Sequence, residues 1–249
     1  MGELTGKTAL VTGGSSGIGL AIADDLARQG ADVIVVGRRQ QVIDEAVAKI
    51  GPRATGIAAD VTRLSDLKDL FGTVKARTPK LDILVCSAGS TGAGPLQTCT
   101  EEAYDALMGL NVKSVFFTVQ QALPLLGEGS SLIVIGSVTD TITVPGGGVY
   151  SASKAALRSF VPTWANDLAP LGIRVNLLSP GITETPLLER LQSSSEGMSR
   201  FDDLIANRTA MKRRGRAEEI ASVATFLASD RSSYMTGGVL YADGGMSTW

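Results

Sequence analysis

The sequence predicts a single α/β domain of the doubly wound kind, in which a seven-stranded parallel sheet carries helices on both faces. Short runs rich in β-branched residues alternate with longer amphipathic segments along the chain. Parallel strands need crossover connections, and this alternation supplies them as helices. The 249 residues, 44% of them apolar, can bury one sizeable core, and no linker or internal repeat divides them.

Seven short runs are expected to form the strands: Thr8–Val11, Asp32–Val36, Ala54–Ala58, Leu81–Cys86, Ser131–Ile135, Ile173–Leu178 and Val239–Ala242. The first helix is expected directly after the first strand, because Ile18, Ile22 and Leu26 repeat at helical spacing. Gly30 is expected to end that helix, since glycine readily adopts the left-handed conformation found there.

Later helices carry their own signals. Ser65 and Thr100 are expected at N-caps, where a hydroxyl can accept a hydrogen bond from a free backbone N–H. Pro162 lies inside the helix expected from about Tyr150 to Leu168. Proline removes one backbone hydrogen bond there, so a kink is expected.

One long segment, residues 183–216, lacks a strand pattern. Its serines and charges are interspersed with apolar residues: Leu187, Leu188, Leu191, Met198, Phe201 and Leu204. A segment of this length inside a compact domain is usually a lid or binding loop with short helices of its own. We therefore expect a substrate lid, and the alternative is a surface connection.

Composition favours a small-molecule partner. The net charge of −2 and the pI near 5.3 provide no basic field that would attract nucleic acid or an anionic membrane. No run reaches the length of a membrane span, and the first residues lack a signal-peptide core. Cys86 and Cys99 form no CxxC pair. A cytoplasmic location is therefore expected.

The absence of histidine excludes several kinds of chemistry. Ser-His-Asp and Cys-His nucleophile systems, histidine-zinc sites and histidine proton shuttles all require the missing residue. We expect no metal site. A proton-transfer group must be another side chain whose pKa is shifted.

A glycine-rich loop, Thr12–Gly19, lies between the first strand and the first helix. Glycines allow a tight turn and let a pyrophosphate approach backbone N–H groups at the positive end of the helix. The loop predicts a nucleotide site formed by Gly13, Ser15, Ser16, Gly17, Ile18 and Gly19.

The spacing Gly-x-x-x-Gly-x-Gly at Gly13–Gly19 resembles the glycine motif of the short-chain dehydrogenase/reductase family. The resemblance covers nearly the whole chain and continues through further motifs: Asp60-Val61, Cys86-Ser87-Ala88-Gly89, Asn111, Ser137, Tyr150, Lys154, Pro180-Gly181, Thr236-Gly237-Gly238 and Asp243-Gly244-Gly245. Cys86-Ser87 departs from the family, which often has two asparagines there. The resemblance implies a Rossmann-type fold, a ketoreductase or alcohol dehydrogenase activity with NADP(H), and a homotetramer.

The resemblance also implies individual roles. Asp60 would bind the adenine amine, and Val61 would pack beside the ring. Lys154 would bind the nicotinamide ribose, and Asn111 would hold a water molecule that links Lys154 to solvent. The remaining cofactor contacts that the resemblance implies come from the segments after the fourth and sixth strands: Ser87, Ala88, Gly89, Pro180, Gly181, Thr183 and Thr185.

The end of the second strand indicates which nicotinamide nucleotide is used. An NAD enzyme of this topology usually has an acid there that binds the ribose 2′-hydroxyl, and Gly37 occupies that position. Arg38 and Arg39 follow, and guanidinium groups suit a 2′-phosphate. NADP(H) is therefore expected. The alternative is that both arginines are solvated at a strand end.

Tyr150 and Lys154 are four residues apart, so on a helix they share one face. A nearby cation favours phenolate, and Lys154 is therefore expected to lower the pKa of Tyr150 and make it an acid and base. Ser137 follows the fifth strand and can stabilise a developing oxyanion. Together with Asn111 these residues are the expected catalytic group.

Three functions remain open. The first is an oxidoreductase acting on small, largely apolar ketones and secondary alcohols. The second is a 3-oxoacyl-[acyl-carrier-protein] reductase, although residues 125–131 lack the basic side chains that dock an acidic carrier. The third is a non-catalytic NADP(H) sensor, which typically loses the tyrosine or lysine.

Two surface features complete the expectations. The basic cluster at Lys212–Arg216 is short and isolated in an acidic chain, so a solvated loop is preferred to a nucleic-acid patch. In the homotetramer, the Tyr150–Leu168 and Ala217–Leu227 helices would pack against symmetry mates through small and apolar side chains: Ala155, Ala156, Phe160, Trp164, Val223 and Phe226.

Overall fold

The computed structural model describes residues 2–191 and 195–248, and the side chains of residues 189–201 lie outside the description. Its centre is a parallel sheet of seven strands in the order β3-β2-β1-β4-β5-β6-β7, which confirms the predicted fold class. The strands are β1 (Thr8–Thr12), β2 (Asp32–Gly37), β3 (Ala54–Ala58), β4 (Ile83–Cys86), β5 (Ser131–Ile135), β6 (Arg174–Pro180) and β7 (Val239–Ala242).

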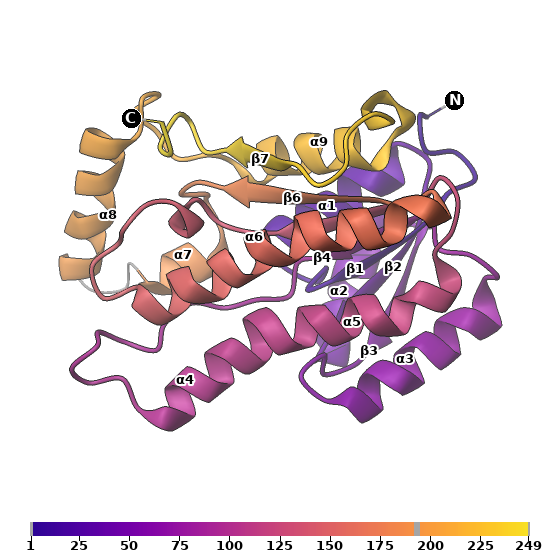
Figure 1. Ribbon diagram of the computed structural model, residues 1–249, viewed down its shortest axis with the longest axis horizontal. Helices are drawn as coiled ribbons and strands as arrows, with labels where there is room; N and C mark the ends of the chain where they lie inside the picture. Colours follow the sequence, from indigo (N-terminus) through magenta and orange to yellow (C-terminus); the bar gives the residue numbers. More distant parts are fainter. Residues whose placement is uncertain (1, 192–194, 249) are drawn as a thin grey trace.

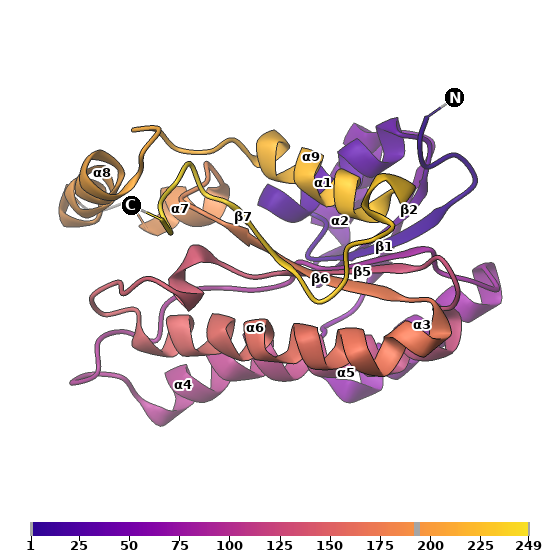
Figure 2. The ribbon, with the colours of Figure 1, turned by 45° about the horizontal axis from the view of Figure 1, so that its top comes forward.

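Helices cover both faces of the sheet (Figures 1 and 2). One face carries α1 (Gly17–Arg28), α2 (Gln40–Ile50) and α9 (Ala217–Ala228). The opposite face carries α3 (Leu64–Arg77), α4 (Glu101–Met108), α5 (Ser114–Ala122) and α6 (Gly148–Leu168). A π-helical turn, η1 (Gly109–Lys113), joins α4 to α5. The short 3₁₀ turns are η2 (Leu123–Leu125), η3 (Val138–Asp140), η4 (Ala169–Leu171) and η5 (Asp230–Ser232).

Consecutive strand residues point to opposite faces and build two separate hydrophobic clusters. Leu10, Leu84 and Leu132 belong to the cluster under α3, α5 and α6. Their neighbours Val11, Val85 and Ile133 belong to the cluster under α1 and α9. Both faces are buried, so the strand sequences are almost continuously apolar.

The strand ends differ slightly from the prediction. Leu81 was expected to open the fourth strand, but its N–H donates to the Leu125 carbonyl oxygen at 2.8 Å, and pairing in the sheet begins at Ile83. The sixth strand extends to Pro180, which has no N–H to donate to the ladder and lies at the carboxyl end of the strand.

The helix signals were mostly confirmed. The Thr100 hydroxyl accepts the Ala103 N–H at 3.2 Å, and Gly30 follows α1 with a φ of 99°. Ser65 was wrong as an N-cap. Arg63 holds that position, because its N–H donates to the Asp60 carbonyl and the turn leads into the helix two residues earlier than expected.

Helix α6 continues past Pro162 to Leu168, so the proline does not end it. Lys154 and Tyr150 lie in its first two turns. No helix among residues 2–191 and 195–248 is long and apolar enough to cross a membrane.

Candidate active site

The candidate site lies at the carboxyl edge of the sheet, where the strand order reverses between β1 and β4. In open α/β sheets, this switch point is the usual place for ligands. The glycine loop after β1 packs against the segment after β4: the Ser87 N–H donates to the Thr12 carbonyl at 3.2 Å. A Cβ on Gly13 would lie 2.8 Å from the Ala88 backbone, and its φ is +67°. Glycine is therefore required for this close approach.

The start of α1 is suited to an anion. Ser16 is the N-cap, and its side chain makes no capping hydrogen bond. Gly17 has a φ of +54°, and a Cβ on Gly19 would lie 2.3 Å from the Gly13 carbonyl oxygen. At its glycine positions, the turn therefore leaves the N-terminus of α1 free of side chains. The first N–H groups and the helix dipole favour a phosphate at this end. Ile18 is half-buried behind this loop.

The second strand ends beside the same loop. A Cβ on Gly37 would lie 2.9 Å from the Ser15 hydroxyl oxygen, so Ser15 fills the space next to this glycine. The side chains of Arg38 and Arg39 are exposed immediately beyond. The two cationic groups thus directly follow Gly37, the position at which an NAD-type site usually has an acid.

Asp60 follows β3 and faces Arg38. Burial acts to raise the pKa of the Asp60 carboxyl, but hydrogen bonds from Thr62 and the cations of Arg38 and Arg63 outweigh it, so the pKa lies below its ordinary value. One carboxylate oxygen accepts the Thr62 N–H at 3.0 Å and its hydroxyl at 2.7 Å. Val61 is buried next to it. The carboxylate is therefore held ionised and oriented.

Asn111 lies in the π-helical turn η1 and is completely buried. Its side-chain oxygen accepts the Ser90 N–H at 2.9 Å, and its amide nitrogen donates to the Ser90 carbonyl at 2.9 Å and to the Ser153 hydroxyl at 3.0 Å. A Cβ on Gly89 would lie 3.3 Å from the Asn111 side-chain oxygen. The amide therefore joins the loop after β4 to α6, and π-helical turns of this kind often mark functional sites.

Lys154 is buried at 7% exposure, and its ammonium donates to the Ile135 carbonyl at 3.0 Å. Burial lowers the pKa of the Lys154 ammonium to about 8, and the negative charge of Asp140 opposes that shift. The ammonium lies 5.8 Å from the centre of the Tyr150 ring. Lysine and tyrosine thus share one face of α6, as their spacing predicted.

Tyr150 differs from the prediction in its pKa. Burial raises the pKa of the Tyr150 phenol, Asp140 raises it further, and a hydrogen bond with Ser137 lowers it. The expected lowering by Lys154 is wrong for this structure, because the ammonium is directed to Ile135 and burial outweighs other effects. The Ser137 hydroxyl also accepts the Thr139 hydroxyl at 3.1 Å. Ser137 and Tyr150 therefore lie within hydrogen-bonding reach.

The segment after β6 returns to the glycine loop. A Cβ on Gly17 would lie 3.5 Å from the Thr185 side chain, and a Cβ on Gly181 would lie 2.7 Å from the Asp243 Cα. The buried Thr183 donates its hydroxyl hydrogen to the Gly181 carbonyl at 3.0 Å. Pro180, at the end of β6, is also buried. These residues border the predicted nucleotide site on its open side.

Residues 183–216 contain the two helices α7 (Pro186–Leu191) and α8 (Ser195–Arg208). Hydrogen bonds join the beginning of this segment to its end: the Glu184 N–H donates to the Gly215 carbonyl at 2.9 Å, and the Gly215 N–H donates to the Ile182 carbonyl at 2.9 Å. Leu188 is buried, and Leu187 and Leu204 are half-buried. The predicted lid side chains of Leu191, Met198 and Phe201 lie outside the described residues.

The basic cluster makes ion pairs with neighbouring acids. Arg213 binds both carboxylate oxygens of Glu219 at 2.7 and 2.8 Å, and Arg214 lies 3.0 Å from Asp202. Arg213 is exposed and Arg214 is half-buried, and the pairing of both with acids agrees with the solvated loop expected from the sequence.

One residue of the site that the sequence patterns did not indicate is Asp140, a carboxylate that acts on both Tyr150 and Lys154. It is the only acidic residue between Glu128 and Asp167 and comes three residues after Ser137. Its isolation in an apolar approach to Tyr150 was a usable signal. Arg63 was also missed, because its effect on Asp60 depends on a turn that sequence alone does not specify.

Known proteins resemble the chain over its full length. A family model described as enoyl-(acyl carrier protein) reductase matches residues 13–247. Oxidoreductase asL5 of Sarocladium schorii is 42% identical over 247 residues, 98% of this chain and 97% of that protein. The 3-oxoacyl-[acyl-carrier-protein] reductase FabG of Thermotoga maritima is 35% identical over 249 residues, 98% of this chain and 99% of that protein.

A solved structure is similar to this chain over the same length as these sequence relatives. The short-chain dehydrogenase from Burkholderia cenocepacia in complex with NADP has a TM-score of 0.90 and 35% sequence identity. The match covers 99% of this chain and 100% of that chain. Similarity at this level extends from the glycine loop to the C-terminal strand.

Proposed function

Because the chain belongs to the short-chain dehydrogenase/reductase family, we propose that it transfers a hydride between NADP(H) and a ketone or secondary alcohol, with Tyr150 as acid and base. One observation carries the proposal. Tyr150, Ser137 and Lys154 gather at the carboxyl edge of the sheet, next to a glycine loop whose helix start is open to an anion. The site therefore combines a proton donor with a nucleotide cradle.

NADP(H) fits the residues present, and the relative from Burkholderia cenocepacia was solved with NADP. The backbone of the glycine loop, where side chains would collide, would hold the pyrophosphate. Arg38 and Arg39 would bind the 2′-phosphate, with Asp60 and Val61 at the adenine. The other contacts come from Ser87, Ala88, Gly89, Pro180, Gly181, Thr183 and Thr185. When bound, the nucleotide supplies or accepts the hydride.

The chain's own residues manage the proton and the developing charge. In reduction, Tyr150 donates its phenolic proton to the carbonyl oxygen of the substrate, and in oxidation the phenolate takes the proton from the alcohol. Ser137 donates a hydrogen bond to the same oxygen as negative charge develops on it. Lys154 supplies positive charge next to the ribose position. Asn111 positions α6 through Ser153 and holds the water link to Lys154.

We propose that residues 183–216 form a lid over a small, largely apolar carbonyl substrate. The half-buried Leu187, Val144 and Val149 supply apolar surface in this lid and in the approach to Tyr150. Gly146 adjoins Pro95, since its Cβ would lie 3.9 Å from the Pro95 side chain. The loop that contains Pro95 also exposes Leu96. Aryl and alkyl ketones should therefore be better substrates than sugars and other polyols.

A second candidate is reduction of 3-oxoacyl-[acyl-carrier-protein], which the FabG relative of Thermotoga maritima favours. Residues 125–131 offer no basic side chain to an acidic carrier. The third candidate, an NADP(H) sensor, would bind the nucleotide without turnover.

One assay separates the three candidates. NADPH oxidation is measured with a panel of ketones, 3-oxoacyl thioesters and sugars. Fastest turnover of an apolar ketone supports the proposal, and a thioester or a polyol as best substrate contradicts it. Nucleotide binding without any turnover points to the sensor.

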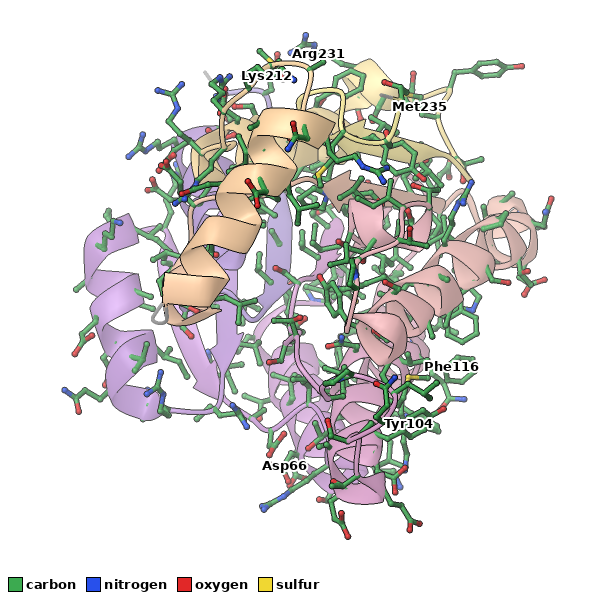
Figure 3. All side chains as sticks on the ribbon, turned by 90° about the vertical axis from the view of Figure 1, so that its left-hand side faces the viewer. Asp66, Tyr104, Phe116, Lys212, Arg231 and Met235 are labelled. Atoms are coloured by element: carbon green, nitrogen blue, oxygen red, sulfur yellow. The ribbon has the colours of Figure 1, made fainter. Side chains whose placement is uncertain are left out.

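We propose a homotetramer with two-fold symmetry, in the cytoplasm. The Phe160 and Trp164 rings of α6 stack at 5.0 Å, and Phe116 of α5 lies 5.8 Å from Phe160. Phe116 is 38% exposed, and Figure 3 shows it on the outside of the molecule. This aromatic face supports association through α5 and α6, while Val223 and Phe226 of α9 are half-buried against the chain's own core. Light scattering near 25.8 kDa at micromolar concentration would contradict the tetramer.

A further inference from the structure

Asp140 is a carboxylate that the proposed mechanism does not use. It ends the turn η3, three residues after Ser137. The hydroxyl of Tyr241 donates to one of its oxygens at 3.2 Å, and the hydroxyl of Ser179 donates to the other at 3.2 Å. Hydroxyls from the carboxyl ends of β6 and β7 therefore hold this carboxylate next to the site.

Titratable groups face Asp140 from two packed elements. The turn η3, which ends at Asp140, packs against α6, the helix that carries Tyr150, Lys154 and Arg158. The charge of Asp140 acts on Tyr150 and Lys154, the charge of Arg158 acts on Asp140, and Tyr241 contacts it from β7. Strand β6 contributes the Ser179 hydroxyl, and Thr141 adds a hydrogen bond from the same turn. Burial raises the pKa of the Asp140 carboxyl above its ordinary value, although hydrogen bonds from Tyr241, Ser179 and Thr141 and the charge of Arg158 act to lower it.

The negative charge has the same effect on two neighbours. It raises the pKa of the Tyr150 phenol and opposes the lowering of the Lys154 pKa by burial. A carboxylate near a phenol and an ammonium favours the protonated form of each, because it repels phenolate and attracts ammonium. In a partly buried setting, water screens this interaction less than at the surface.

On the basis of the function proposed above, we propose that Asp140 is a positioning residue. Its charge keeps Tyr150 and Lys154 protonated and so extends carbonyl reduction to more alkaline pH. It touches neither substrate nor nucleotide. It acts through the tyrosine and the lysine, and the hydroxyls of Tyr241 and Ser179 keep its charge in place.

The test is the pH profile of kcat/KM for ketone reduction at saturating NADPH, measured on the full chain. In Asp140→Asn the alkaline limb should move to lower pH by about half a unit or more, which is a roughly threefold change in the phenol fraction at a given pH. The rising limb of alcohol oxidation should move in the same direction. Asp167→Asn removes an exposed acid from α6, the helix that carries Tyr150 and Lys154, and should leave both limbs in place.

Asp140→Ser is the second neutral variant, and Asp140→Glu retains the charge. Both neutral variants should move the limbs alike, and Asp140→Glu should keep them near the wild-type position. A structural role would instead lower the rate at every pH without moving the limbs. The proposal would be overturned if the limbs of the pH profiles of Asp140→Asn and Asp140→Ser coincided with those of Asp167→Asn.

Folding offers a separate check. Burial disfavours the charged carboxylate, so the neutral variants should fold. If neither neutral variant folded, Asp140 would be a residue required for folding, and the proposal would be overturned. A wild-type chain that reduced no ketone with NADPH would refute the proposed function, whereas an active chain with unmoved limbs would refute the role of Asp140 alone.

Discussion

Removing the guanidinium of Arg38 should weaken NADPH binding and leave NADH binding almost unchanged. Gly37 contributes no side chain at the end of β2, so the 2′-phosphate would rely on Arg38, Arg39 and the neighbouring Ser15 hydroxyl. A hydrogen bond to a charged group contributes about 1.5–3 kcal/mol. The Arg38→Ala variant should therefore bind NADPH roughly ten- to a hundredfold more weakly.

The assay is a fluorescence titration of each variant with NADPH and with NADH. Arg63→Ala is the matched control, because Arg63 and Arg38 both act on Asp60 but only Arg38 follows Gly37. The control should bind NADPH within about twofold of the wild type, since no phosphate contact is removed. Equal use of NADPH and NADH by the unmodified chain would refute the reasoning, as would equal losses in the two variants.

Two further predictions concern the catalytic group. Ser137→Ala should lower kcat on the order of a hundredfold or more with nucleotide binding retained, because it removes a donor to the developing oxyanion, and a fall of less than about fivefold in steady-state assays would contradict this. Lys154→Met should raise the stability at pH 7 by about 2 kcal/mol, after allowance for its lost hydrogen bond to Ile135. The sign follows because the pKa of Lys154 in the folded chain, about 8, lies below the ordinary lysine value of 10.5. The unfolded chain thus binds more protons between these values, and wild-type stability rises with pH there. Urea unfolding at pH 7 and pH 10 should therefore show the variant's advantage shrinking, and an advantage that grows would contradict the assignment.

Local sequence patterns were sufficient for the fold. Neighbouring pairs such as Leu10 and Val11 are both apolar, which indicated a sheet covered on two faces, and the structure assigns the two residues to different clusters. The spacing of Gly13, Gly17 and Gly19 indicated the nucleotide loop, because close backbone approach excludes a side chain at such positions. These inferences need only the residues and their order.

The parts that sequence missed depend on the tertiary environment. The pKa of Tyr150 was expected to fall, since Lys154 is four residues away, but burial and Asp140 raise it. The hydroxyls that hold Asp140 in place belong to Tyr241 and Ser179, which are about a hundred and about forty residues away in the chain. Local spacing contains no information about such contacts.

The central claim, that Tyr150 transfers the proton, is tested most directly by Tyr150→Phe. The variant retains the glycine loop and the arginines, so NADPH should bind within about threefold of the wild-type affinity. The fully exposed Tyr234 provides the control Tyr234→Phe, which should turn over normally. Turnover of a ketone by Tyr150→Phe should fall at least a hundred- to ten-thousandfold, roughly the contribution of a positioned acid or base. Near-normal turnover by Tyr150→Phe would contradict the account.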